Sequence, residues 1–176
     1  MNNLILKSIT WDHPRGYAPL YASADRYKKL TGVDIIWSKR SLKDFGDTSI
    51  QALSENFDLL IIDHPHIGIA AVSQCLLKLD ELMSKEELNL FALQSVGPSF
   101  LSYNYQNHQW ALPIDAACQV ASYRSDLFLS KIPETWNKVF SIANNLRQKK
   151  KFIGIALCGT DCNCTFLTLS AQHNEV

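Results

Sequence analysis

The chain has 176 residues, 17 basic and 17 acidic side chains, and 47% hydrophobic residues. This length allows one domain, or one and a half, with a buried core. Zero net charge without a basic stripe argues against nucleic-acid binding, and no apolar run approaches the roughly 20 residues that span a bilayer. The one cationic run, residues 147–151, suits a helix end, where basic side chains interact favourably with the helix dipole.

Predicted strands and helices alternate along the first 75 residues. Strands are predicted over residues 4–10, 33–37 and 57–62, and the last is a continuous apolar run, typical of a strand buried on both faces. Helices are predicted over residues 17–30, ending at Gly32, over residues 48–55, capped by Asp47, and over residues 67–75. This alternation indicates right-handed βαβ units, a parallel sheet and the α/β class.

The second half is less regular. Ser84 and Glu87 form a capping box that opens a helix of about ten residues. The remaining predictions, in chain order, are a hairpin of residues 102–105 and 109–112 around Asn107-His108, an extended segment at 113–124, a helix over 136–146, a strand over 152–157, and a frayed end from 172 to 176. We therefore expect a first lobe of residues 1–112, followed by a crossing segment and a partial second lobe in residues 113–176.

Polar and aromatic side chains follow each predicted strand. Open parallel sheets bind ligands beyond the carboxyl ends of their strands, so these side chains should meet at one rim. Aromatic faces cover apolar ligand faces, while Asp, His and Arg hydrogen-bond hydroxyls or acids, a combination that suits a polar small molecule. The candidate ligand-binding residues are Trp11, His13, Arg15, Arg40, Asp63, His64 and Asp115.

Most of these candidates also have a structural interpretation. Trp11 could close the core, His13 could cap the helix that follows it, and Asp63 could cap the next helix. Arg15 at a helix start meets an unfavourable dipole, so a purely structural role is less natural there. His64 and His66 flank Pro65, so we expect at most one of them to face a ligand.

A metal-dependent enzyme is the alternative from a different functional class. His13, Asp63, His64 and His66 offer imidazole and carboxylate ligands that suit zinc or iron, although Pro65 disfavours a strand that would point both histidines one way.

The cysteines and the known catalytic motifs give this alternative no support. Five cysteines do not predict a disulfide framework, and the spacing of Cys158, Cys162 and Cys164 matches no standard zinc site, so we expect small buried cysteines. The sequence has no G-x-S-x-G elbow and no glycine-rich nucleotide loop, and we expect no catalytic residues and no cofactor.

Several motifs resemble a known family over nearly the whole chain, to about Leu169. They are Ile9-Thr10-Trp11-Asp12-His13-Pro14-Arg15-Gly16, Trp37-Ser38-Lys39-Arg40-Ser41-Leu42, Asp63-His64-Pro65-His66-Ile67-Gly68, Ala111-Leu112-Pro113-Ile114-Asp115-Ala116-Ala117, and Pro133-x-Thr135-Trp136. Together they resemble a subset of the family 1 extracellular solute-binding proteins, the sugar-binding components of ABC transporters.

The resemblance implies a periplasmic-binding-protein-like fold of type II, with lobe one and only part of lobe two present. It implies a small polar solute, a carbohydrate, bound between lobes that close around a hinge near residues 113–120, and delivery to an ABC permease. Members are usually extracytoplasmic, whereas residues 1–10 are too short and too quickly polar for a secretory signal, so the sequence as written predicts the cytoplasm. A cytosolic ligand-sensing lobe is therefore a further alternative, and we expect weak or absent ligand binding by this length of chain alone.

Overall fold

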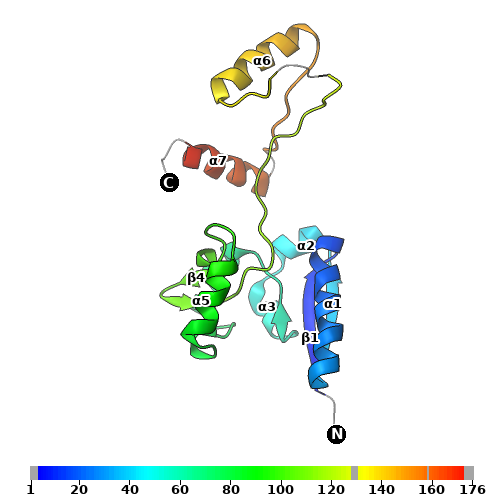
Figure 1. Cartoon of the computed structure of the whole chain (residues 1–176), viewed down its shortest axis with the longest axis vertical. Coiled ribbons are helices and arrows are strands. Elements are labelled where there is room, and N and C mark those ends of the chain that lie inside the picture. Colours follow the sequence, from blue (N-terminus) through cyan, green and yellow to red (C-terminus); the bar gives the residue numbers. More distant parts are fainter. Residues whose placement is uncertain (1–3, 128–130, 158, 173–176) are drawn as a thin grey trace. The chain divides into compact units, whose positions relative to one another are not determined.

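A parallel sheet flanked by helices lies in the amino-terminal part of the chain (Figure 1). The computed structural model describes residues 4–127, 131–157 and 159–172. The chain divides into two compact units, Met1–Ala116 and Ala117–Val176, so the division falls four residues after the expected end of lobe one. Each unit is described by itself below.

The sheet consists of β1 (Ile5–Trp11), β2 (Asp34–Arg40) and β3 (Leu59–Leu60), in the order β2-β1-β3 and all parallel. The predicted βαβ arrangement and α/β class are thus confirmed. The third predicted strand was too long, and its burial was wrong, because β3 has two residues and Leu59 is 39% exposed. In the described part of the chain β3 pairs with β1 alone, so only one side of it carries a ladder.

Helix α1 (Pro14–Thr31) connects β1 to β2, and its ends follow the expected signals. The Nδ1 atom of His13 accepts a hydrogen bond from the Arg15 backbone N–H, which caps the start. Gly32 ends the helix in the left-handed region, at φ 78°, where a residue without a Cβ is favoured.

Two short helices, α2 (Leu42–Asp47) and α3 (Ile50–Ser54), replace the single helix predicted over residues 48–55. The prediction that Asp47 caps this helix was wrong, because Asp47 is the last residue of α2. Ser41 caps α2 by accepting from the Asp44 backbone N–H at 3.1 Å, and the extended backbone of Thr48, at ψ 129°, separates the two helices.

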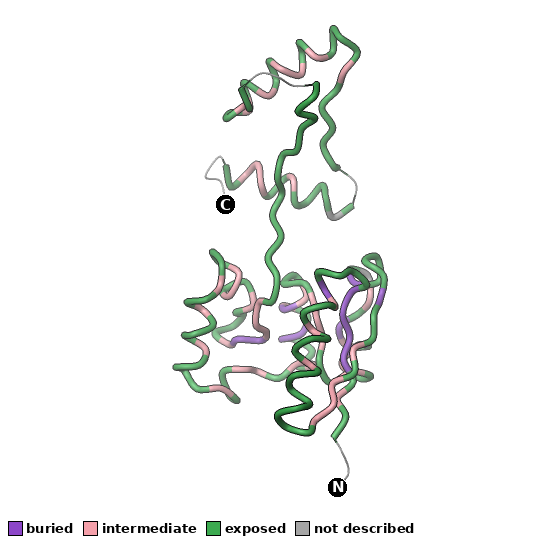
Figure 2. Tube along the Cα trace, turned by 45° about the vertical axis from the view of Figure 1, so that its right-hand side comes forward, coloured by how far each residue is buried: buried purple, intermediate pink, exposed green. Residues whose placement is uncertain are grey.

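The buried residues of the first unit gather on β1 and on the helices beside the sheet (Figure 2). Helix α4 (Ile67–Ser73) follows the 3₁₀ turn η1 (His64–His66). A second small cluster packs α4 against Trp110, close to the hairpin described below. There Ile67, Ala71 and Trp110 are buried together.

The capping box at Ser84 is confirmed. Helix α5 (Lys85–Gln94) begins with the Ser84 side chain accepting from the Glu87 backbone, while the Glu87 carboxylate accepts from the Ser84 backbone. The hairpin is also confirmed as β4 (Asn104–Tyr105) and β5 (His108–Gln109), although its turn lies one residue earlier than expected. Gln106 and Asn107 have φ values of 52° and 63°, as a two-residue hairpin turn with both central residues left-handed requires.

Asp80, in the 3₁₀ turn η2 (Leu79–Glu81), holds the hairpin in place. Its Oδ2 lies 2.8 Å from His108 Nδ1, and its Oδ1 accepts from the Gln109 backbone N–H at 2.8 Å. Burial by itself raises the pKa of Asp80, but the hydrogen bonds from His108 and Gln109 together outweigh it and lower that pKa below its ordinary value.

Asp80→Asn is expected to lower the free energy of unfolding by about 1 kcal/mol at neutral pH, because the hydrogen bonds to a charged acceptor are weakened. A carboxyl whose pKa is lowered in the folded state contributes fully above its unfolded pKa, near 4, and loses that contribution as the pH falls through the folded pKa. The difference between variant and wild type should therefore shrink as the pH falls below about 4 and disappear once the carboxyl is protonated in the folded state as well, as measured by thermal unfolding across pH. Asp25→Asn, on an exposed i,i+4 pair with Lys29, is the control, and a pH-independent difference for Asp80→Asn would contradict the mechanism.

The second unit contains α6 (Trp136–Gln148), capped by Thr135, and α7 (Thr160–Gln172). The helix over residues 136–146 is confirmed. The strand predicted over residues 152–157 was wrong, since these residues pair with no strand in the described part of the unit. Helix α7 was not predicted, and residues 173–176, most of the segment expected to fray, lie outside the described residues.

None of the described residues of the second unit is buried (Figure 2). Cys118, Cys162 and Cys164 are exposed, so the expectation of buried cysteines was wrong for them, and Cys158 lies outside the described residues. Over residues 4–127, 131–157 and 159–172, no helix combines the length and the apolar character needed to cross a membrane.

Candidate ligand-binding site at the carboxyl edge of the sheet

The three parallel strands end at one edge of the first unit. Trp11 pairs with Arg40 at the ends of β1 and β2, and the Asp12 backbone N–H donates to the Arg40 carbonyl at 2.7 Å. The Ile61 backbone N–H, just after β3, donates to the Ile9 carbonyl at 3.0 Å, so the chain arrives at Asp63 beside the end of β1. This is the edge at which parallel sheets bind ligands.

The Trp11 ring closes the core rather than opening onto this edge. The residue is 8% exposed, and its ring lies 5.3 Å from the Phe45 ring, centroid to centroid. A Cβ at Gly16 would come within 2.6 Å of the indole, so a glycine is needed where α1 crosses the ring. The structural interpretation of Trp11 is therefore the one that its packing favours.

His13 and Arg15 lie at the start of α1, beside the edge. His13 is exposed and uses Nδ1 for the helix cap, as described above. The Nε atom of Arg15 lies 3.1 Å from Asp115 Oδ2, and the two side chains are 59% and 32% exposed. Two predicted ligand-binding residues, one in α1 and one a hundred residues later, are thus brought together as an ion pair.

Arg40 faces the interior. The residue is 8% exposed, its Nη2 donates to the Ile61 carbonyl at 2.9 Å, and its guanidinium carbon lies 4.8 Å from the centre of the Phe45 ring. Burial lowers the pKa of Arg40, and the carboxylates of Asp63 and Asp44 act in the opposite direction. Phe45 therefore supports both Trp11 and Arg40 beneath the edge.

Asp63 and His64 are exposed at the edge, and Asp63 makes no side-chain capping bond with η1. The hydroxyl of Tyr103 lies 3.5 Å from the Ile62 carbonyl. Burial raises the pKa of Tyr103, and the carboxylates of Asp63 and Asp115 raise it further. Tyr103, from the 3₁₀ turn η3 (Leu101–Tyr103), therefore belongs to the same set of polar groups.

The sequence analysis missed Tyr103 and Lys39. Lys39 Nζ lies 2.7 Å from Asp12 Oδ1 and 4.4 Å from the centre of the Tyr17 ring. The hydrogen bond to Asp12 is the main cause that raises the pKa of Lys39. Lys39 could have been predicted, because it stands one residue before the end of β2. Tyr103 could not, because nothing in the sequence relates it to Asp63.

A pocket of about 210 Å³ adjoins Asp115. Its walls come from the end of α5 and from the segment that leaves the hairpin, namely Gln94, Ser95, Val96, Ser99, Pro113, Ile114, Asp115 and Ala116. The lining is a mixture of polar and apolar side chains, and the pocket is smaller than the roughly 300–1,000 Å³ of typical small-molecule sites.

The four residues of the metal hypothesis do not form a metal site. Within the residues that the structure describes, no group of three or more His, Cys, Asp or Glu side chains is placed to hold a metal ion. His13 is engaged in its helix cap, and Asp63, His64 and His66 lie along one turn that Pro65 stiffens. No described contact favours the enzyme alternative.

The fold is an α/β fold of the periplasmic-binding-protein-like type. The structure of the Thermus thermophilus maltotriose binding protein bound with maltotriose is similar to it, with a TM-score of 0.53 and 13% sequence identity over 88% of this chain. At this identity the likeness shows the fold alone, and this chain covers 38% of that protein. No family model and no curated protein matches the sequence.

Proposed function

We propose that this chain is the substrate-binding component, in part, of an ABC-type uptake transporter, and that it binds a small, uncharged, sugar-like solute at the carboxyl edge of its sheet. The observation that carries the proposal is the convergence of Asp63, Tyr103, Arg15 and Asp115 there, on a fold that resembles a maltotriose-binding protein. The solute would be held between two lobes, with residues 113–120 contributing to the hinge.

The balance of charge at the edge supports an uncharged solute. Among the candidate residues and Lys39 with its partner, the carboxylates belong to Asp12, Asp63 and Asp115, and the cations to Arg15, Lys39 and Arg40. Two cations are paired with carboxylates, and Arg40 is turned inward towards Phe45. Because both exposed cations are paired with carboxylates, the edge offers hydrogen-bond donors and acceptors that suit the hydroxyl groups of an uncharged solute.

A titration with maltotriose and with common mono- and disaccharides, followed by amide NMR shifts of the 176-residue chain, tests this proposal. We expect shift changes centred on Asp63, Tyr103 and Asp115 with a Kd in the range of about 1 mM, a free energy near −4 kcal/mol, since one lobe supplies only part of a cleft. Asp63→Asn should raise that Kd about tenfold by weakening a charged hydrogen bond.

Asp25→Asn is the matched control, because it removes a carboxylate from an exposed position in the middle of α1 and should leave the Kd unchanged. The proposal fails if no carbohydrate shifts these resonances, or if Asp63→Asn and Asp25→Asn have the same effect. Delivery to a permease and an extracytoplasmic location are parts of the same proposal. Reconstituted uptake, with and without this protein, would test the delivery.

A further inference from the structure

Arg40 is a buried cation whose hydrogen-bonding capacity is largely unused. The residue is 8% exposed, and its Nε and Nη1 atoms are buried without a hydrogen-bond partner in the described part of the chain. Its guanidinium faces the Phe45 ring, which offers a cation–π contact but no carbonyl or carboxylate acceptor. A buried charge with unmade hydrogen bonds lowers stability, so packing alone does not account for an arginine at the end of β2.

The hydrogen bond that Arg40 does make reaches the segment between β3 and Asp63. Its Nη2 atom donates to the Ile61 carbonyl at 2.9 Å. The Ile61 backbone N–H donates to the Ile9 carbonyl at 3.0 Å, so both backbone groups of Ile61 are fixed. Asp63 follows two residues later, and its position at the edge therefore depends on how Ile61 is held.

The next two carbonyls of this segment are held less firmly. The Tyr103 hydroxyl lies 3.5 Å from the Ile62 carbonyl, which is the limit for a hydrogen bond. The Asp63 carbonyl accepts from the His66 backbone N–H at 3.1 Å, within the same turn of the chain. Of the two described side-chain contacts with the segment, the one from Arg40 is thus the shorter, and hydrogen bonds from a charged donor are the stronger kind.

The charge of Arg40 acts on Asp63 as well. Burial lowers the pKa of Arg40, and the Asp63 carboxylate is the stronger of the two carboxylates that act in the opposite direction. The attraction is mutual, and it is stronger in a low-dielectric surrounding than in water. Asp63 is exposed at the edge, so its carboxylate is attracted towards the end of β2 while it stays available to a solute.

We propose that Arg40 is a positioning residue, which fixes the backbone that leads into Asp63 and thereby holds the Asp63 carboxylate where it binds the solute. The inference rests on the proposed function for the role of Asp63. It assigns to Arg40 an action through Asp63 in place of a direct contact with the solute, because Nε and Nη1 are buried and Nη2 is engaged with Ile61.

Amide hydrogen exchange of the Arg40→Met chain, followed by NMR, tests the positioning without any ligand. This substitution keeps most of the length of the side chain and removes both the charge and the donor to Ile61. We expect exchange of the Ile61 amide to become at least about tenfold faster, because the segment before Asp63 loses its main side-chain support.

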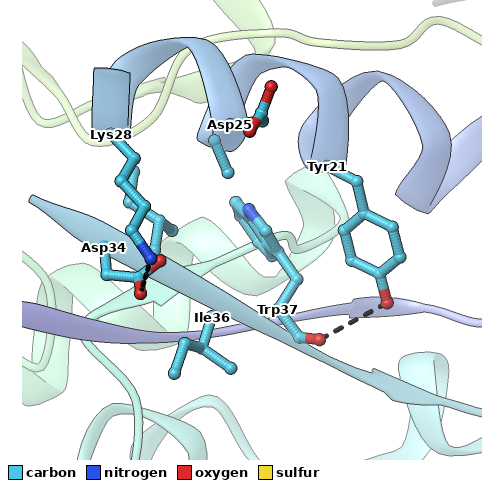
Figure 3. A pocket seen from close by; sticks show the side chains of 8 residues that line it. Tyr21, Asp25, Lys28, Asp34, Ile36 and Trp37 are labelled. Carbon is cyan, nitrogen blue, oxygen red and sulfur yellow. Dashed lines mark hydrogen bonds and ion pairs between the residues drawn. The ribbon is translucent and has the colours of Figure 1, made fainter. Parts of the chain in front are cut away.

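The Asp34 amide is the internal reference, because it lies at the opposite end of the same strand. It donates to the Leu4 carbonyl at 2.9 Å, and the Asp34 carboxylate is paired with Lys28 Nζ of α1 (Figure 3). Its exchange rate should not change. Arg26→Met, the same substitution at an exposed position of α1, is the matched control and should alter neither amide. An unchanged Ile61 amide, or equal acceleration of the Ile61 and Asp34 amides, overturns the proposal.

A double-mutant cycle with a sugar tests whether Arg40 acts through Asp63. The probe is maltotriose, or the sugar that binds most tightly in the titration proposed above. Arg40→Met should raise its Kd about fivefold in the wild-type chain and less than about twofold in the Asp63→Asn chain, because a positioning residue loses its effect once the group that it positions is impaired. Equal effects in both chains would indicate a direct contact or a general structural role, and either overturns the proposal.

The two experiments separate this inference from the proposed function. If no sugar binds the chain, the proposed function fails, and the exchange of the Ile61 amide alone decides whether Arg40 holds the segment before Asp63. If Arg40→Met does not fold, Arg40→Lys takes its place, since a lysine side chain is one bond shorter and lacks the reach of Nη2 to the Ile61 carbonyl. The same changes in exchange and in Kd are then expected, and their absence overturns the proposal.

Discussion

Trp11→Ala is expected to lower the free energy of unfolding of the first unit by about 3–5 kcal/mol, the usual cost of deleting a large buried aromatic side chain. The ring is 8% exposed, packs against Phe45, and lies directly under Gly16, where no Cβ fits. Its removal leaves a cavity between β1, α1 and α2 that rigid neighbours cannot fill. Urea unfolding, followed by far-ultraviolet circular dichroism, measures the loss.

The control is Phe140→Ala, which deletes an aromatic ring that is 61% exposed and should change stability by less than about 1 kcal/mol. The two interpretations of Trp11 give opposite results. A stacking platform for sugar rings would lose affinity on truncation and keep its stability, whereas a core residue loses stability first. If the Trp11→Ala protein is stable but no longer binds carbohydrate, Trp11 is a ligand-binding residue and the structural interpretation is wrong.

The order of strands and helices in the first unit was predictable because each element carries its own local signal. The spacing of apolar residues marks α1, Gly32 ends it, and the pair Ser84 and Glu87 opens α5. These signals act within one turn of a helix, so they hold whatever surrounds the element. The edge at which the candidate residues meet was also predictable, because the carboxyl ends of parallel strands lie at the same edge of a sheet.

The direction of each side chain was not predictable, because it depends on packing between distant segments. Trp11 and Arg40 both end strands, yet both turn towards Phe45, a residue of a helix whose bounds the sequence did not give correctly. Tyr103 joins the edge through the hairpin, 40 residues after Asp63, and only the fold brings them close. Likewise, β3 is short because strand length depends on neighbouring strands as well as on apolar sequence.

The second unit shows the converse, since α6 carries a clear local signal but none of the unit's described residues is buried. The apolar face of α6, predicted from Trp136, Val139, Phe140, Ala143 and Leu146, is present, but none of these side chains is buried. One contact joins α6 to α7 through a hydrogen bond, from Trp136 Nε1 to the Gln172 side chain at 2.7 Å. Exposed hydrogen bonds of this kind contribute little net stability.

Amide exchange in α6 and α7 is therefore expected to be about 1,000-fold faster, relative to the intrinsic rates, than exchange in β1. Helices of 13 residues are marginal in water unless a face is buried, and none of the described residues of either helix is fully buried. Ser8 and Thr10, which are 0% exposed in β1, should instead open only with the whole first unit. Mass spectrometry of the exchanging 176-residue chain measures both regions in one sample, so β1 serves as the internal control. Equal protection of α6 and β1 would show that residues 117–176 possess a core of their own, while rapid exchange would mean that their folding depends on surfaces outside that unit.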